Sequence, residues 1–311
     1  MTLEASHAEV TTLPLVQEEG LRASFATGGK PLYKQPAFMA VILLLILLTA
    51  IYYRIFFKLV SDWYTLPDFS HGFLVPFFAA LLLWEKRAAI RALPPKPSWA
   101  GAPLLILGLF TLLVGDYGAV LFLSRISFLL IVAAIVLLLY GGAMLREISL
   151  ILFVLLLAIP IPAIIFNQVT VPLQFFASKV ASSILPLFGV PILREGNVIQ
   201  LPAMQLEVAE ACSGIRSLMS LFTLAVVYGH FIEHTHTRRA LLALASIPIA
   251  VAANAIRIVG TGLCVQFWNP DKALGFFHEF SGWVMFVVSL ACLYLVHLAM
   301  RLVDSRRRYA L

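Results

Sequence analysis

The sequence predicts an all-α, polytopic integral membrane protein with about eight transmembrane helices. Of the 311 residues, 61% are hydrophobic and only 12% are charged, and the mean hydropathy is +0.95. Apolar runs long enough to cross a bilayer recur along the chain, and in lipid such runs satisfy their backbone polar groups as helices. The alternating pattern of membrane-spanning strands is absent from the sequence. These observations exclude a soluble enzyme and an outer-membrane barrel.

One membrane domain, 36–303, is expected between two tails. Residues 1–35 are mixed in charge and predict a mobile cytoplasmic tail, and residues 304–311 form a basic cytoplasmic tail. The formal charge of +6 does not indicate a nucleic-acid partner, because the basic residues gather at helix ends, where they set topology. The three cysteines make neither a disulfide framework nor a zinc-type CxxC pair. We expect neither a metal nor a cofactor, and the expected surroundings are the lipid bilayer.

The first half of the chain contains four expected spans, and a fifth follows them. A loop containing Ser70-His71-Gly72 joins the first two, and a proline-rich basic loop separates the second from the third. Pro160-Ile161-Pro162 interrupts the fifth span, because proline cannot donate a helix hydrogen bond. The expected spans cover about 37–57, 73–84, 100–115, 119–140 and 148–165.

The second half contains the longest stretch with polar residues, before three further spans. Residues 168–187 are apolar but broken by polar side chains such as Lys179, which predicts an amphipathic helix at the membrane interface. In 190–208, Glu195-Gly196-Asn197 lies between β-branched residues and predicts a small hairpin on the periplasmic side. The remaining spans cover about 213–231, 240–264 and 280–302.

Lys and Arg near the span ends predict the orientation. With eight spans, nearly all of these residues fall on one side, which is therefore the cytoplasmic side of a bacterial inner membrane, together with both termini. Arg54 and Lys58 lie at the other end of the first span, where long basic side chains can extend to the interface. The hairpin and the starts of the sixth and eighth spans then face the periplasm.

The stretch Glu210-Ala211-Cys212-Ser213-Gly214-Ile215-Arg216-Ser217 opens the sixth span. The start of a helix carries partial positive charge and free N–H groups, and Arg216 lies one turn after Cys212 on the same face. Both features favour the thiolate, which is the nucleophilic form of cysteine. The alternative is that Cys212 is a small apolar filler, as Cys264 and Cys292 are expected to be. A disulfide between Cys212 and Cys264 also stays open.

Arg257 and His278 are expected at the same membrane depth as Cys212, on two other helices. An ionisable residue inside a span is costly and is a functional candidate by default. A cysteine nucleophile needs a base, and its tetrahedral intermediate needs fixed positive charge, so Cys212, His278 and Arg257 form a candidate catalytic set. The alternatives are an interfacial histidine and a structural ion pair of Arg257. Its candidate partners are Asp116, Glu207 and Glu210.

Other polar residues are candidates for substrate contact or for support of the catalytic set. His71 lies on the outer side and acts as a second acid/base group, contacts substrate or stabilises its loop. Asn254 precedes Arg257 by one turn and either orients it or bonds between helices. Arg216 and Glu210 flank the cysteine. A histidine cluster follows the sixth span and is interpreted as a solvated loop rather than a metal site; its members are His230, His234 and His236.

These motifs resemble the exosortase/archaeosortase family of membrane transpeptidases. The resemblance rests on Ala211-Cys212-Ser213-Gly214-Ile215-Arg216, on Asn254-Ala255-Ile256-Arg257 followed by His278, and on the Ser70-His71-Gly72 loop. It implies that Cys212 is the nucleophile and that Arg257 and His278 are its partners. It also implies the substrates: exported proteins with a C-terminal Pro-Glu-Pro motif, one membrane helix and a basic tail. In Gram-negative bacteria such proteins accompany exopolysaccharide production.

The resemblance and the residues together predict a cysteine transpeptidase that cleaves this sorting signal through a thioester, at the outer face of the inner membrane. Arg216 or another outer cation is expected to bind the glutamate of the motif. Two alternatives stay open. A transporter for polysaccharide or lipid-linked sugars predicts charges throughout the bilayer depth, and a non-catalytic assembly protein predicts that Cys212 is dispensable.

Overall fold

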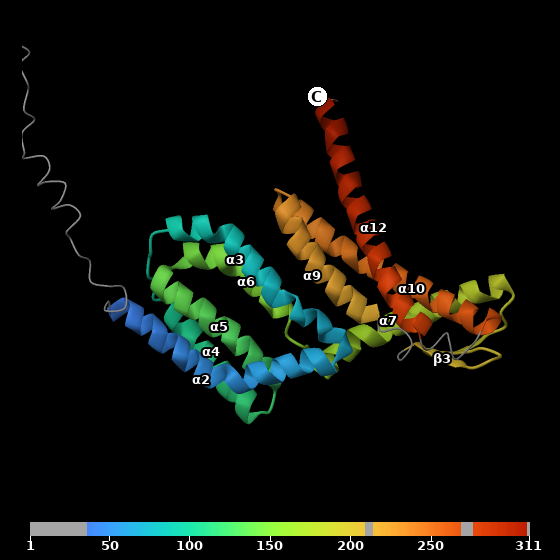
Figure 1. The fold of residues 1–311 in the computed structure, drawn as a ribbon, viewed down its shortest axis with the longest axis horizontal. Coiled ribbons are helices and arrows are strands. Elements are labelled where there is room, and N and C mark those ends of the chain that lie inside the picture. Colours follow the sequence, from blue (N-terminus) through green and yellow to red (C-terminus); the bar gives the residue numbers. More distant parts are fainter. Residues whose placement is uncertain (1–35, 209–213, 269–275, 310–311) are drawn as a thin grey trace, which may run out of the picture. The chain divides into compact units, whose positions relative to one another are not determined.

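The computed structural model describes residues 36–208, 214–268 and 276–309. Within these ranges the chain is almost entirely helical (Figure 1). The elements, in chain order, are α2 (Pro36–Thr65), η2 (Pro67–Phe73), α3 (Val75–Ala92), α4 (Gly101–Tyr117), α5 (Leu121–Tyr140), α6 (Gly142–Leu157), α7 (Ala163–Ile184), η3 (Leu185–Phe188), β1 (Leu193–Glu195), β2 (Val198–Gln200), β3 (Gln205–Glu207), α9 (Gly214–Ile232), α10 (His236–Phe267) and α12 (Phe276–Tyr309).

The fold class expected from the sequence is confirmed: the protein is an all-α polytopic membrane protein. Among the described residues, six segments are long and apolar enough to cross a membrane, and α4 is a shorter apolar helix. Both α3 and α6 are short and carry charges at one end. The long segments are Ile42–Thr65, Leu121–Tyr140, Ala163–Phe188, Gly214–Ile232, His236–Phe267 and Phe280–Val303.

The chain divides into two compact units, Met1–Tyr53 and Arg54–Leu311, and all contacts described below lie within the second. Its tightest helix pair is α4 with α5, which pack through glycines at seven-residue intervals on α4. A Cβ on Gly108 would lie 2.8 Å from Ile131, and one on Gly115 would lie 2.5 Å from the backbone of Ser124. Small residues at such an interface let two membrane helices approach closely.

The prolines at 160 and 162 divide the expected fifth span into two helices. Helix α6 ends at Leu157, and α7 begins at Ala163. The break leaves carbonyl groups at the end of α6 without partners in their own helix. Two of these, on Ala158 and Leu157, accept hydrogen bonds from Trp63 at the end of α2 and from His71 of η2.

Helix α7 was expected at the interface, although its length and composition would let it cross a membrane. Its start packs against η2, where the rings of Phe166 and Phe69 lie 5.5 Å apart. Its end packs on the later part of α10, where a Cβ on Gly262 would lie 3.0 Å from Leu185. Because η2 and this part of α10 flank the same cavity, described below, α7 runs along one end of the helix bundle.

The expected hairpin is confirmed as part of a three-stranded antiparallel sheet in the order β1-β2-β3. Gly196 makes its turn with a positive φ of 65°, a conformation that glycine adopts without strain. The sheet buries Ile199 and Leu206 against Ala181 of α7 and Ile258 of α10. The third strand, which was not expected separately, leads the chain toward the start of α9.

Candidate functional site

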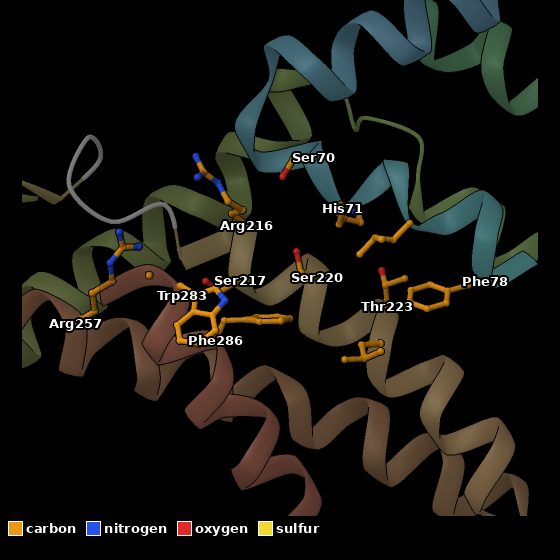
Figure 2. A pocket seen from close by; sticks show the side chains of 13 residues that line it. Ser70, His71, Phe78, Arg216, Ser217, Ser220, Thr223, Arg257, Trp283 and Phe286 are labelled. Atoms are coloured by element: carbon orange, nitrogen blue, oxygen red, sulfur yellow. The ribbon is translucent and has the colours of Figure 1, made fainter. Parts of the chain in front are cut away.

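A cavity of about 560 Å³ lies at the end of the bundle where α9 begins. It brings together η2, α3, α9, α10 and α12, so residues from distant parts of the sequence face one space (Figure 2). The lining residues are Ser70, His71, Leu74, Phe78, Arg216, Ser217, Ser220, Thr223, Leu224, Arg257, Gly282, Trp283 and Phe286.

The free carbonyls at the end of α6 position the Ser70-His71-Gly72 loop. Trp63 donates from Nε1 to the Ala158 carbonyl at 2.8 Å. Its indole fills the space where a side chain on Gly72 would be, since a Cβ there would lie 2.3 Å from Nε1. Only glycine fits against the indole at this position. His71 then donates from Nε2 to the Leu157 carbonyl, 3.1 Å away.

His71 is buried and faces the cavity as a neutral ring. Burial lowers the pKa of His71 below its usual value and outweighs the backbone carbonyls of Leu157 and Asp68, which favour the charged form. The other ring nitrogen, Nδ1, is buried and makes no hydrogen bond to the described residues. In the neutral ring the proton is on Nε2, where it bonds to the Leu157 carbonyl, and Nδ1 carries none.

Helix α9 contributes a hydroxyl-rich wall. Ser217, Ser220 and Thr223 recur every three residues, so they lie on one face of the helix. The Thr223 hydroxyl is buried and has no hydrogen-bond partner among the described residues. Figure 2 shows these hydroxyls along the helix, on the side where His71 also lies. A buried hydroxyl without a partner is costly, so this wall is suited to a ligand that forms hydrogen bonds.

Arg216 lies at the outer rim of the cavity. Its Nε is 3.8 Å from Oδ1 of Asp68, and the Arg216 side chain is 51% exposed. Such a long, exposed ion pair contributes little to stability, but it holds the guanidinium between α9 and η2. A positive charge at this rim attracts an anionic group in a ligand.

Arg257 lies where α10 meets α12. Its Nε donates to Oγ of Ser281 at 3.3 Å, and the guanidinium lies over Gly282, whose missing side chain leaves room for it. Ser281 and Gly282 follow His278 by three and four residues, and helical residues at these spacings share a face. The backbone of His278 belongs to the first turn of α12. Its side chain lies outside the described residues.

Asn254 meets the first residue of α9. A Cβ on Gly214 would lie 2.7 Å from the Asn254 amide. Asn254 and Arg257 are three residues apart on α10, so one face of this helix reaches both the start of α9 and the first turns of α12. Cys212 and Glu210 lie outside the described residues, so the expectations for these two residues stay predictions.

The cavity therefore includes three of the residues singled out from the sequence, His71, Arg216 and Arg257, and a fourth, Asn254, packs beside the start of α9. The sequence interpretation missed the hydroxyl wall, although the three-residue spacing was visible. It also missed Arg125, which is buried in α5 and forms an ion pair with Asp62. Span interiors are thus less uniformly uncharged than the sequence pattern indicated.

The other candidates lie away from the cavity. Cys264 is buried in the core beneath the sheet, and the described thiols of Cys264 and Cys292 are free. His230 lies 3.4 Å from a carboxylate oxygen of Glu85 at the opposite end of the bundle. The described residues contain no group of three or more metal-binding side chains.

This chain matches the model of a known protein family. The family model described as Transmembrane exosortase (Exosortase_EpsH) matches residues 63–295, which include η2, α3, α9, α10 and the greater part of α12, the elements around the cavity. Comparisons with curated proteins and with solved structures find no match. Because the family model covers well over half of the chain, the protein belongs to the transmembrane exosortase family.

Proposed function

We propose that this exosortase-family protein is a cysteine transpeptidase with Cys212 as nucleophile and Arg257 and His278 as its partners. The observation that carries the proposal is the cavity beside the start of α9, which has two arginines and a hydroxyl wall. Cys212 precedes Gly214 by two residues. Two residues of chain reach at most about 7 Å, so the position of Gly214 limits how far Cys212 can lie from this helix start.

In the proposed reaction, His278 accepts the proton of the Cys212 thiol, and the thiolate attacks a peptide carbonyl. Arg257 stabilises the negative charge that develops on the carbonyl oxygen. The peptide C–N bond then breaks, the new amino group takes the proton from His278, and a thioester remains on Cys212. Water or an acceptor amine attacks the thioester and regenerates the thiol.

The cavity supports the proposed substrate, an exported protein with a Pro-Glu-Pro motif followed by a membrane helix and a basic tail. The described lining residues include Arg216 and Arg257 and no carboxylate, which suits the glutamate of the motif. The lining also contains aromatic residues such as Phe78 and Trp283, which offer apolar surface for the start of the substrate helix. Hydroxyls on α9 can accept hydrogen bonds from the free N–H groups at the start of such a helix.

The proposed orientation places the cavity on the periplasmic side. At the opposite end of the bundle, Lys86 lies 3.1 Å from Glu147, and Arg146 and Arg239 line a second cavity. Clustered basic residues at one end favour a cytoplasmic position for that end. When the motif of a substrate reaches the first cavity, the basic tail of that substrate would lie at the opposite, cytoplasmic end of the bundle.

Replacement of Cys212 tests the mechanism. Cys212→Ala is expected to abolish cleavage of a co-expressed, tagged Pro-Glu-Pro substrate, because no other group can form the thioester. Cys264→Ala and Cys292→Ala are the matched controls and are expected to keep most activity. The mass of the substrate's C-terminus is measured for each variant. Normal processing by a Cys212→Ala protein that accumulates in the membrane would show the mechanism to be wrong.

A further inference from the structure

A second cavity, of about 680 Å³, lies between α3, α6, α9 and α10 at the end of the bundle away from the site. Its walls are of two kinds. One part is basic and contains Lys86, Arg146 and Arg239 with two histidines, and the other is formed by apolar side chains that include Phe153, Phe222 and Leu244. The proposed reaction uses none of these residues.

The basic part is held in place by contacts behind it. Lys86 donates to the backbone carbonyl of Glu147 at 2.9 Å and to its carboxylate at 3.1 Å. Arg239 donates from Nε to the Glu233 carbonyl at 2.7 Å, which fixes the plane of its guanidinium. The carboxylates of Glu147 and Glu85 neutralise part of the charge from outside, but the described lining itself contains no acidic residue.

A buried nitrogen adds a further observation. The His230 side chain is 10% exposed and lines the cavity, and its Nε2 lies 3.4 Å from Glu85. Its Nδ1 is buried and makes no hydrogen bond within the described ranges. His230 therefore adds a largely buried polar side chain to the basic part of the wall.

We propose that this cavity binds an anionic phospholipid, with the phosphate at the basic residues and an acyl chain along the apolar wall. Basic pockets between membrane helices at the cytoplasmic level bind phosphate-bearing head groups, and arginine matches phosphate geometry through paired hydrogen bonds. Free inorganic phosphate satisfies only the basic part, whereas a lipid also covers exposed apolar surface such as that of Phe153 and Leu244. The site is independent of the proposed transpeptidase chemistry.

Lipid binding to the purified full-length protein tests the proposal. The protein is placed in zwitterionic nanodiscs that contain a small fraction of phosphatidylglycerol, and retained lipid is counted by native mass spectrometry. Arg146→Glu removes a cation that lines the cavity and places an anion beside the phosphate, so it is expected to weaken retention by at least about tenfold. The matched control is Arg91→Glu, an exposed residue of α3 outside the cavity lining, with an expected change below about twofold.

Equal losses from Arg146→Glu and Arg91→Glu would overturn the proposal, because general surface charge would then explain binding. Should Arg146→Glu lower the melting temperature, Arg146→Gln provides the same comparison with an expected loss of about fivefold. A further experiment distinguishes a phospholipid from free inorganic phosphate as the ligand. Phosphatidylglycerol retention is expected to survive millimolar inorganic phosphate and to fall in Phe153→Ala but not in Leu241→Ala, an exposed residue of α10 outside the lining. Displacement by inorganic phosphate, without an effect of Phe153→Ala, would rule out the lipid.

Discussion

At the scale of single residues, Arg257 shows how contacts with α12 hold a cation at the edge of the cavity. Its guanidinium uses Nε on Ser281 and lies over Gly282, so α12 supports it from one side while another side lines the cavity. The guanidinium is therefore held at the border of the cavity. In the proposed reaction it stabilises the oxyanion of the tetrahedral intermediate.

Arg257→Lys is expected to preserve the fold and to lower turnover by roughly a hundredfold, since loss of one oxyanion donor costs on the order of 3 kcal/mol. Lysine retains the charge but cannot reproduce the rigid fork of donors. Cleavage rate and melting temperature are measured on the same purified variant. Substrate binding is expected to change little, because the interaction strengthens only as charge develops.

The outcome that contradicts this role is near-normal cleavage by a folded Arg257→Ala protein. A loss of stability that accounts for all of the lost activity would instead assign Arg257 a structural role, because removing one partner of a buried pair leaves an uncompensated charge. Ser281→Ala serves as a milder control, since it removes the hydrogen bond to Nε and leaves the guanidinium in place.

From the sequence alone, charged residues of the candidate site could be recognised better than neutral polar ones. Arg257 and Arg216 are conspicuous in an apolar sequence because a charge in a membrane needs a reason. Thr223 and Ser220 gave no such signal, because hydroxyls in membrane helices usually bond to their own backbone. Arg125 was overlooked, since its partner Asp62 is 63 residues away and only the fold brings the two together.

At the scale of elements, the contact between α9 and α10 fixes where α9 begins, two residues after the proposed nucleophile Cys212. Gly214 begins α9 directly against the Asn254 side chain. Any side chain at 214 would have to displace this amide, because a Cβ would come within 2.7 Å of it. The glycine is thus required by packing rather than by backbone conformation.

Gly214→Ala is expected to destabilise the protein by about 1–3 kcal/mol, the usual cost of overpacking, and to slow cleavage by moving the start of α9. Gly260→Ala is the matched control, because nothing lies within 4 Å of a Cβ at that position of α10. Alanine in that helix interior is expected to stabilise by about 0.5–1 kcal/mol. Thermal unfolding and cleavage rates are compared for both variants.

Asn254→Ser in the Gly214→Ala background supplies the second test, since a shorter polar side chain makes room for the new methyl group. Partial recovery of stability and cleavage is expected. If Gly214→Ala behaves like Gly260→Ala, the close contact between α9 and α10 does not position the reactive stretch.

The sequence predicts the type of each element well, but it predicts element boundaries and positions in the bundle less well. The hairpin around Gly196 and the break at Pro160 follow from local chemistry. The course of α7 does not, since Ala163–Phe188 satisfies the criteria for a membrane span. Polar residues such as Lys179 pointed to the interface, and only the contacts at the two ends of α7 show that it stays at one end of the bundle.

At the scale of the whole molecule, the polar residues that line cavities gather at two opposite ends of the helix bundle. The site cavity is at one end, and the basic cavity with Lys86 and Arg239 is at the other. The positive-inside rule predicts that the basic end is cytoplasmic. Reporter fusions after Asn197 and after Asp271 are therefore expected to report export, and a fusion after Glu233 is expected to report a cytoplasmic position.

A fusion after Lys96, in the basic loop before α4, is the internal control, because it should agree with the fusion after Glu233. The reverse pattern at all four positions would place the proposed nucleophile in the cytoplasm and overturn the proposed substrate. Agreement of only some fusions would show that α7 or a short helix crosses differently from the proposed arrangement.

The course of α7 has a consequence for how the enzyme responds to its membrane. Because α7, the sheet and the end of α10 share one core, the interfacial position predicted for α7 would carry the whole platform at the head-group level. A thicker or thinner bilayer tilts spanning helices at small cost per ångström, while an interfacial platform follows the surface. With α7 at the interface, lipid composition would act on the angle at which α9 leaves this platform, and membrane thickness would become a physical variable of the exosortase site.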